Sequence, residues 1–317
     1  MHSNEASSLF MIRLFDPAHD LPALVNLINA IDAVDQSGEA TTEDQQHAQL
    51  DWPGRDLLHD SWVATAAGRA DQLIGYGDSW KTPATATADI YVGVHPGWRR
   101  RGLGRELLRR TLVRAHEQAA AYVAVYADVN NAASHAFLHN QGFQVAGAFV
   151  ELYLALPDTI ETPQWPAGYA LRRLSEAPDL PGLVNILNQS YGDRFGHKIT
   201  TEIEIESWLA LETAGNILLL FDASETAIGI CRVRPTTSTQ GDIAGRIGYL
   251  DAPGVVPTHR QSGLYRSLVL AGMELLCQQG QTAIVFESWG DEERIIADYC
   301  GLGFRRQRHF MAYQHVL

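Results

Sequence analysis

The stretch that decides the fold reads Val92-Gly93-Val94-His95-Pro96-Gly97-Trp98-Arg99-Arg100-Arg101-Gly102-Leu103-Gly104-Arg105-Glu106-Leu107-Leu108. An apolar segment typical of a β-strand runs into a basic turn with glycines, and the turn runs into an amphipathic helix. Glycine lets a backbone approach a ligand closely and adopt dihedral angles closed to other residues. The first N–H groups of a helix have no intrahelical partner, and the helix dipole favours negative charge there. The segment therefore predicts an anion-binding turn between a strand and a helix.

Other phosphate-binding motifs fit this segment less well. A P-loop needs Gly-Lys followed by Ser or Thr, and that sequence is absent here. A dinucleotide fingerprint needs a third glycine where this chain has Leu107. Arginine, which occupies six of the positions from 99 to 110, would also suit nucleic acid or a solvated helix start. The formal net charge of −13 argues against a broad nucleic-acid surface.

The spacing Arg99-x-x-Gly102-x-Gly104 resembles the pyrophosphate-binding signature of the GNAT (GCN5-related N-acetyltransferase) family, whose members hold acetyl-coenzyme A. The resemblance implies that acetyl-CoA is the co-substrate and that the strand, turn and helix bind it. In the first half we expect the cofactor-binding residues to be Val92, Val94, Arg99, Arg100, Arg101, Gly102, Leu103, Gly104, Arg105 and Asn131. Helix capping would explain Asn131 equally well.

The chain repeats itself over most of a domain length. Residues 24–29, Leu-Val-Asn-Leu-Ile-Asn, recur as Leu-Val-Asn-Ile-Leu-Asn at 183–188, which is 159 positions later. From the basic turn onward the offset is 161, and the matched pairs include Arg99 with Arg260, Gly102 with Gly263, and Gly142 with Gly303. A period of this size excludes a solenoid and indicates a tandem duplication.

The duplication and the length of 317 residues predict two domains. We expect an N-terminal domain over 1–156, a linker over 157–168 that carries three prolines, and a C-terminal domain over 169–317. Each copy is expected to run strand, two helices, three strands, helix, strand, helix, with Thr41 and Thr200 capping the second helices. This mixed α/β order resembles the GNAT fold in both halves, a mostly antiparallel central sheet flanked by helices.

Composition bounds the class of protein. A hydrophobic content of 46% is ample for two cores, and no apolar run approaches the roughly 20 residues that span a bilayer. The first residues lack a basic-then-apolar signal peptide. The cysteines, Cys231, Cys277 and Cys300, are odd in number and widely spaced, which suggests reduced thiols and offers no metal pattern. We expect a cytoplasmic protein without a metal and without a membrane or nucleic-acid partner.

The resemblance also implies a reaction. In the GNAT family an acceptor amine attacks the thioester carbonyl directly, so the site must supply an oxyanion donor and a proton for the departing thiolate. The family commonly takes that proton from a tyrosine four residues before a Gly-Phe pair. In the second half that position is Tyr299, whereas in the first half it is Leu138, which has no proton to give. A tyrosine packed into the core would look the same in sequence.

The second half has a modified turn, Arg260-Gln261-Ser262-Gly263-Leu264-Tyr265. Tyr265 replaces the final small residue. If this position is already helical, any residue can present its N–H to an anion, and the alternative is that the bulky side chain crowds a diphosphate. The matching cofactor-binding residues of this half are Val255, Arg260, Gln261, Ser262, Gly263, Leu264, Tyr265 and Arg266.

An acid and a base candidate both fall in the second half. Glu287 follows the fifth strand, where the resemblance places the acceptor site, and it could deprotonate the amine. A surface glutamate would look like Glu287 in sequence. Asp251, near the middle of the fourth strand, is a second base candidate with the same weakness. We therefore expect the second half to be catalytic, with Tyr299 and Glu287. The first half would be an acetyl-CoA-binding domain that is weak, or uses another acid, or is purely structural.

The leading hypothesis is an acetyl-CoA-dependent N-acetyltransferase that acts on the amine of a small molecule. Tandem members of the family, such as the mycothiol synthases, resemble this chain in size and duplication. The alternative is a binding module, an acyl-CoA sensor or scaffold built from degenerate copies, which Leu138 and Tyr265 favour. The fused halves are expected to form a monomer or a homodimer.

Overall fold

The structure, a computed structural model, describes residues 9–50, 55–82, 85–176, 178–192, 199–211, 214–236, 246–291 and 293–317. Its internal contacts form two compact units. Unit 1 comprises Met1–Ala146 together with Phe310–Leu317, and unit 2 comprises Gly147–His309. Each unit is a mixed, mostly antiparallel sheet flanked by helices, which confirms the fold class expected from the sequence.

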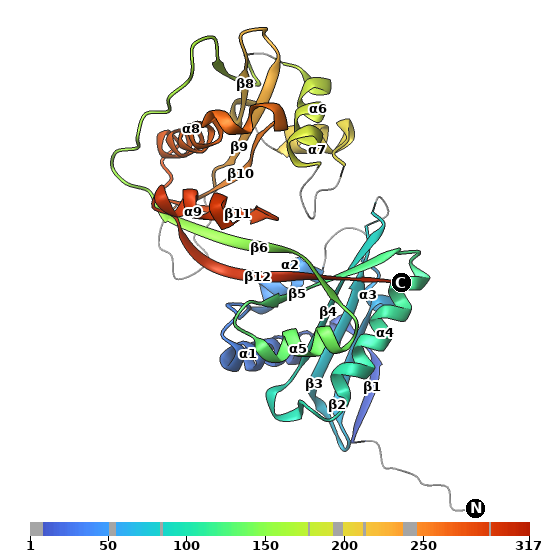
Figure 1. Cartoon of the computed structure of the whole chain (residues 1–317). Helices are drawn as coiled ribbons and strands as arrows, with labels where there is room; N and C mark the ends of the chain where they lie inside the picture. Colours follow the sequence, from blue (N-terminus) through green and yellow to red (C-terminus); the bar gives the residue numbers. More distant parts are fainter. Residues whose placement is uncertain are drawn as a thin grey trace, which may run out of the picture. The chain divides into compact units, whose positions relative to one another are not determined.

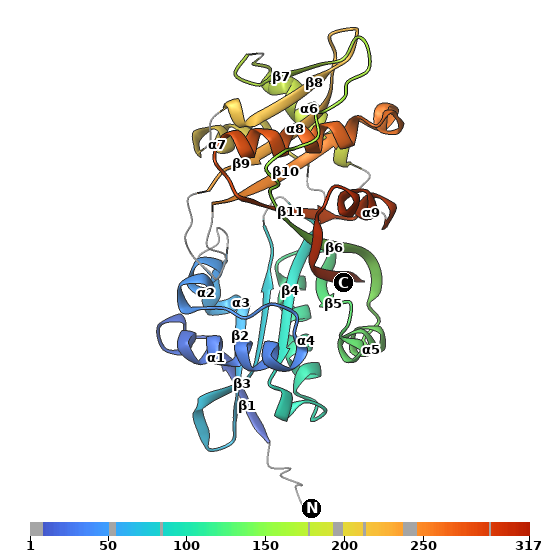
Figure 2. The ribbon, with the colours of Figure 1, turned by 90° about the vertical axis from the view of Figure 1, so that its left-hand side faces the viewer.

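Unit 1 places one twisted sheet between two pairs of helices. Its elements are β1 (Phe10–Leu14), α1 (Pro17–Asp35), α2 (Glu43–Leu50), α3 (Leu57–Asp60), β2 (Ser61–Ala66), β3 (Arg69–Trp80), β4 (Thr87–Val94), α4 (Leu103–Glu117), β5 (Tyr122–Asp128) and α5 (Ala132–Asn140). Neighbours in the order β1-β2-β3-β4 are antiparallel, and β5 is parallel to β4. Figure 2 shows α1 and α2 on one side of this sheet and α4 and α5 on the other.

Unit 2 repeats this order. Its elements are β7 (Ala170–Arg173), α6 (Leu180–Tyr191), α7 (Glu202–Leu211), β8 (Ile217–Phe221), β9 (Ala227–Arg234), β10 (Ile247–Val255), α8 (Leu264–Gln278), β11 (Ala283–Trp289) and α9 (Glu293–Gly301). Here β10 and β11 are the parallel pair, and β7, β8, β9 and β10 are antiparallel neighbours. Figure 1 shows α8 on one side of β8–β10 and α6 and α7 on the other.

The last strand of each copy pairs with the other copy. The first copy ends in β6 (Gln144–Ala155), which pairs antiparallel with β11 of unit 2. The second copy ends in β12 (Arg305–Val316), whose residues from Phe310 onward pair antiparallel with β5 of unit 1. Neither strand was expected from the sequence. Because the two strands are exchanged, the sheet of each unit contains a strand from the other copy.

The compact units and the sequence copies therefore have different bounds. The division at 157–168 follows the duplication, whereas the contacts divide the chain at 146/147 and at 309/310 because β6 and β12 are exchanged. Residues 157–168 contain neither helix nor strand. They lie against α8, where Ser267 donates a hydrogen bond to the carbonyl of Gln164 at 2.6 Å and Arg266 pairs with Glu161 at 2.7 Å.

Polar side chains make the same bridge in both copies. Asn29 in α1 exchanges two hydrogen bonds with the backbone of Thr41, at 3.0 and 2.8 Å, and Asn188 in α6 does so with Thr200, at 2.9 and 2.8 Å. The expected helix caps are consequently wrong by one residue. Because Thr41 is held by Asn29, the helix starts one position later, and Thr42 accepts the capping bond from the N–H of Gln45 at 3.3 Å.

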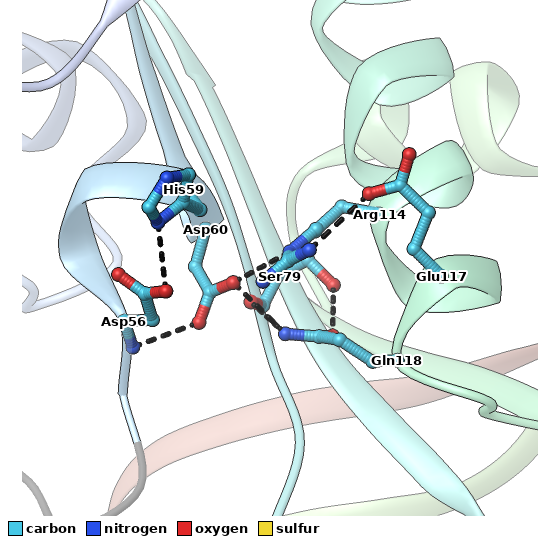
Figure 3. A network of polar contacts seen from close by, with 7 residues as sticks. All are labelled: Asp56, His59, Asp60, Ser79, Arg114, Glu117 and Gln118. Carbon is cyan, nitrogen blue, oxygen red and sulfur yellow. Dashed lines mark hydrogen bonds and ion pairs between the residues drawn. The ribbon is translucent and has the colours of Figure 1, made fainter.

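A buried carboxylate fixes the far end of α4 in unit 1 (Figure 3). Asp60, which is 3% exposed, accepts hydrogen bonds from Arg114 at 2.7 Å, from Gln118 at 3.0 Å and from the N–H of Asp56 at 2.9 Å. Gln118 also accepts a bond from Ser79 in β3. The network joins α3, β3 and α4, so it holds the helix whose other end is the predicted anion-binding turn.

Candidate active site

The parallel strands β4 and β5 separate partway along their length. Their pairing runs from Thr87 with Tyr122 to Asp89 with Ala124 and ends there. Beyond that point a cavity of about 480 Å³ is lined by residues 91–94 of β4 and 125–128 of β5. The separation creates an open strand edge next to the glycine-bearing turn.

Most of the predicted cofactor-binding residues of the first half meet at this cavity. Those that line it are Val92, Val94, Arg99, Arg100, Gly102, Gly104, Arg105 and Asn131. Asn131 also caps α5 by accepting a bond from the N–H of Ser134 at 3.0 Å, so its position is compatible with helix capping and with cofactor binding. Leu103 is fully buried and can offer only its backbone.

The open edge of β4 presents backbone groups to the cavity. The N–H of His95 bonds to the carbonyl of Ile74 in β3 at 2.9 Å. Because backbone groups alternate in direction along a strand, those of Val94 and Val92 point away from β3, toward the separated part of β5. An extended chain such as a pantetheine arm can pair with such an edge as one more strand would.

The turn has the backbone that its glycines predict. Gly102 has a φ of 84° and is the residue before α4, and no side chain among the described residues caps this helix. A Cβ built on Gly102 would meet no atom within 4 Å, so the glycine is required by its dihedral angles and not by crowding. The N–H groups of the first turn of α4 are therefore available to an anion.

The arginines of the turn have different tasks. Arg99 makes a two-bond ion pair with Asp35 at the end of α1, both bonds at 2.8 Å, and its Nε donates to the carbonyl of Val94 at 3.2 Å. It thereby fastens α1 and β4 to the turn. Arg101 stacks on Trp98 at 4.7 Å and does not line the cavity. Arg100 and Arg105 do line it, and neither forms an ion pair within the described part of the chain, so these two are suited to phosphate.

The opposite side of the cavity is polar and aromatic. Glu39, Tyr91, Tyr126 and Asp128 line it, and Phe310 of the exchanged strand β12 closes it. Burial raises the pKa of Tyr126, and the carboxylate of Asp89 raises it further. Burial also raises the pKa of Tyr91, and the charge of Glu39 adds to the effect. Both phenols therefore keep their protons at neutral pH.

The turn of unit 2 copies the backbone of the first. Gly263 has a φ of 70°, and Arg260 donates from Nε to the carbonyl of Val255 at 3.2 Å, as Arg99 does to Val94. Arg260 also donates to the carbonyl of Ser190 at 2.8 Å, while Arg266 is paired with Glu161. Val255 and Leu264 are buried. Gln261 and Ser262 lie in the turn Pro257–Ser262, but their side chains are outside the described part.

Tyrosines fill the space next to this second turn. The hydroxyl of Tyr299 makes a short hydrogen bond to the hydroxyl of Tyr265, and Tyr299 is only 1% exposed. Its pKa is raised by burial, by Tyr265 and by Asp291. From α6, Tyr191 lies against Gly254, where a built Cβ would be 2.9 Å from its ring. The expected proton donor is therefore enclosed by protein, and Tyr265 would have to move to admit a thiolate.

The structure does not bring the two expected catalytic side chains together. The ring of Phe286 packs on Tyr299 with centroids 4.6 Å apart, so the adjacent Glu287 points to the other face of β11. Glu287 stands opposite Glu151 of β6, and Trp289 donates to it at 3.4 Å. Although the side chain is accessible, the surrounding atoms remove part of its hydration, which raises its pKa, and Glu151 adds to the effect.

Asp251 is held by arginines. It pairs with Arg232 at 3.0 Å and with Arg234 at 3.5 Å. Both arginines belong to β9, so the two ion pairs tie β10 to β9. Asp251 is therefore better explained as a structural partner of β9.

Two residues of the cavity wall, Tyr126 and Phe310, were not expected from the sequence. Tyr126 could have been identified from the repeat, because it lies 161 residues before Glu287 and occupies the same position of its copy. Phe310 could not have been identified in this way, because only the exchange of β12 brings it to unit 1. A larger hollow of about 860 Å³ lies along β1 and the turn between β2 and β3, but none of the predicted residues lines it.

Among the helices in the described part of the chain, none combines the length and the apolar character that a membrane span requires. Within the same ranges, no group of three or more His, Cys, Asp or Glu side chains is arranged to hold a metal ion.

The sequence of this chain is similar to that of known acetyltransferases. Residues 25–143 match the sequence model of a family described as the acetyltransferase (GNAT) family. Mycothiol acetyltransferase of Saccharomonospora viridis is 26% identical over 148 residues, which is 45% of this chain and 47% of that protein. The match thus spans about half the length of this curated relative.

Solved structures are similar over nearly the whole chain. A GCN5-related N-acetyltransferase from Sphaerobacter thermophilus has a TM-score of 0.77 at 19% identity, covering 98% of this chain and 96% of that one. A tandem GNAT protein from the clavulanic acid biosynthesis pathway has a TM-score of 0.65 at 16% identity, covering 97% and 98%. At these identities the likeness shows the fold alone, which occurs twice in this chain.

Proposed function

We propose that the chain is an acetyl-CoA-dependent N-acetyltransferase, because residues 25–143 match the sequence model of the acetyltransferase (GNAT) family and the fold of the chain is similar to that of a tandem GNAT protein. It transfers the acetyl group directly to the amine of a small molecule. The coenzyme binds in unit 1, between the separated ends of β4 and β5. The observation that carries this proposal is the cavity of about 480 Å³ at that place.

The parts of the cavity match the parts of the coenzyme. The uncapped N-terminus of α4, with Arg100 and Arg105, suits the diphosphate. The backbone of Val92 and Val94 suits the amides of the pantetheine arm, and an N–H of this edge can stabilise the oxyanion of the attacked thioester. Both substrates would then meet in the gap between the strands, where positioning itself supplies part of the rate.

Unit 2 offers less to a coenzyme. Tyr265 stands where unit 1 has Gly104, and its hydroxyl is engaged with Tyr299. Arg266, which matches Arg105, is paired with Glu161, whereas Arg105 forms no ion pair within the described part of the chain. These contacts favour unit 1 as the place of transfer, although the sequence alone favours Tyr299 as the acid.

The test is release of free thiol from acetyl-CoA with a panel of amines, together with calorimetric binding of acetyl-CoA. We expect saturable binding at one site per chain and thiol release with at least one amine. Binding without thiol release above background would instead support the alternative, a sensor or scaffold. Tyr299→Phe should leave turnover within about twofold, and a loss of ~10²-fold or more would move the reaction to unit 2.

A matched pair of glycine variants locates the coenzyme. Gly102→Glu and Gly263→Glu place the same side chain at residues of similar φ, 84° and 70°, where a Cβ meets no atom within 4 Å. The conformational cost is therefore alike, on the order of 1–2 kcal/mol. Only Gly102→Glu should abolish acetyl-CoA binding, because its carboxylate repels the diphosphate. Loss of binding with Gly263→Glu alone would place the coenzyme in unit 2.

A further inference from the structure

The two catalytic positions expected in the second copy have counterparts in the first. At the offset of 161 residues, Tyr299 corresponds to Leu138 and Glu287 corresponds to Tyr126. Leu138 is 5% exposed and packs in the core between the sheet and α5. Tyr126 instead lines the cavity in which we place the thioester. Unit 1 therefore lacks a hydroxyl at the position of Tyr299 but has one at the position of Glu287, on β5.

The strand geometry directs Tyr126 to the gap. It lies two residues beyond Ala124, the last residue of β5 that pairs with β4. Its neighbours Val125 and Ala127 face the core beneath α4 and α5, so the ring of Tyr126 lies on the opposite face of the sheet. Val92, across the gap on β4, lines the same cavity. The hydroxyl thus comes from the side opposite the helices that hold the coenzyme, next to the point where the strands part.

We infer that Tyr126 is the proton donor of the acetyl transfer in unit 1, an inference that rests on the proposed function. The neutral nitrogen of the acceptor attacks the carbonyl carbon and forms the C–N bond. As the C–S bond breaks, the phenol gives its proton to the sulphur. The phenolate then takes the proton that the nitrogen loses, so the products are the amide and the free thiol and Tyr126 returns to its starting form.

The surroundings keep the hydroxyl of Tyr126 protonated at neutral pH. Burial and the carboxylate of Asp89 both raise the pKa of Tyr126. Three other residues with a hydroxyl group line the cavity: Ser37, Tyr91 and Ser134, the last of them on α5. The hydroxyl of Ser37 lies 3.0 Å from a carboxylate oxygen of Asp32 and 3.0 Å from one of Glu39, and it can donate its one proton to either. Tyr91 lies along β4 over Gly93, where a built Cβ would be 2.9 Å from its hydroxyl.

The test compares two tyrosines of one strand. Tyr126→Phe removes the hydroxyl, whereas Tyr122→Phe makes the same change four residues earlier on the same face, at a side chain that is 38% exposed and does not line the cavity. Tyr126→Phe should lower kcat by ~10²-fold and leave the Kd for acetyl-CoA within about twofold. Tyr122→Phe should leave both unchanged.

Each other outcome overturns the inference in its own way. Wild-type kcat in Tyr126→Phe would overturn it while the proposed function stands, as would a loss of kcat in Tyr91→Phe alone. Parallel losses of acetyl-CoA affinity and kcat in Tyr126→Phe would show a packing role. If the unaltered protein binds acetyl-CoA but releases no thiol with any amine, the proposed function fails, and the role of Tyr126 fails with it.

Discussion

Gly104 and Tyr265 occupy the same position of the repeat, the second residue of the helix after the turn. Gly104 lines the cavity, and a Cβ built on it would make only ordinary contacts, 3.6 Å from Val94 and 3.8 Å from Phe137. In the second copy the phenol of Tyr265 stands at this position and bonds to Tyr299. A single side chain therefore accounts for much of the difference between the two turns.

Gly104→Tyr should close the first turn as Tyr265 closes the second. We expect it to remove the stabilisation that acetyl-CoA gives, about 2.7 kcal/mol at a concentration of 100 Kd. Thermal unfolding with and without the coenzyme measures this. Gly104→Ala is the control, since its Cβ makes only ordinary contacts and should keep most of the effect. Unchanged stabilisation of Gly104→Tyr would contradict the placement of the diphosphate.

At the scale of elements, the two ends of α4 differ. Its first turn is uncapped and faces the cavity, while its last turn is fixed by the Asp60 network (Figure 3). Between them, Leu103 and Leu107 pack on the sheet beside Ala64 and Ile74. The helix can leave its N-terminal amides to a ligand because packing and the buried carboxylate stabilise the rest.

Asp60→Ala should lower the free energy of unfolding of unit 1 by about 2–3 kcal/mol. The change leaves Arg114, Gln118 and the N–H of Asp56 without their shared acceptor in a largely buried place. Urea denaturation measures the loss. Glu117→Ala removes an exposed partner of the same arginine and should cost no more than about 0.5 kcal/mol. Equal losses in the two variants would show that the buried network stabilises unit 1 no more than one exposed ion pair does.

At the scale of the molecule, the duplication is tied together by the exchange of its last strands. Residues from Phe310 onward cover the edge of β5, and Phe310, Ala312 and Tyr313 are buried there. Burying each large apolar side chain contributes roughly 1.5–3 kcal/mol. The cavity of unit 1 is thus completed by residues encoded at the far end of the chain.

Deletion of residues 310–317 should therefore destabilise unit 1 and abolish acetyl-CoA binding. It removes Phe310 from the cavity wall and leaves β5 with an open edge. Calorimetry and thermal unfolding measure the two effects. A shorter deletion of Val316 and Leu317, which are 68% and 36% exposed, should keep binding. Wild-type affinity in the longer deletion would show that the exchanged strand is not needed for the site.

Local features of the chain are readable without a structure because they depend on residues near one another. The glycine turn, the apolar stripe of the following helix and the repeat at 159 and 161 positions determine two α/β copies and the place of the anion-binding turn. The same information names Val92, Arg100 and Gly104. It cannot tell that Arg99 is occupied by Asp35, 64 residues away.

Only the tertiary structure decided which turn stays open and what completes the cavity. Tyr265 meets Tyr299 across 34 residues, and Phe310 reaches β5 across 182. Such contacts depend on how strands pair and helices pack at long range, which local patterns do not encode. For that reason the sequence places the acid in the second copy, while packing favours the cavity of unit 1 and the hydroxyl of Tyr126.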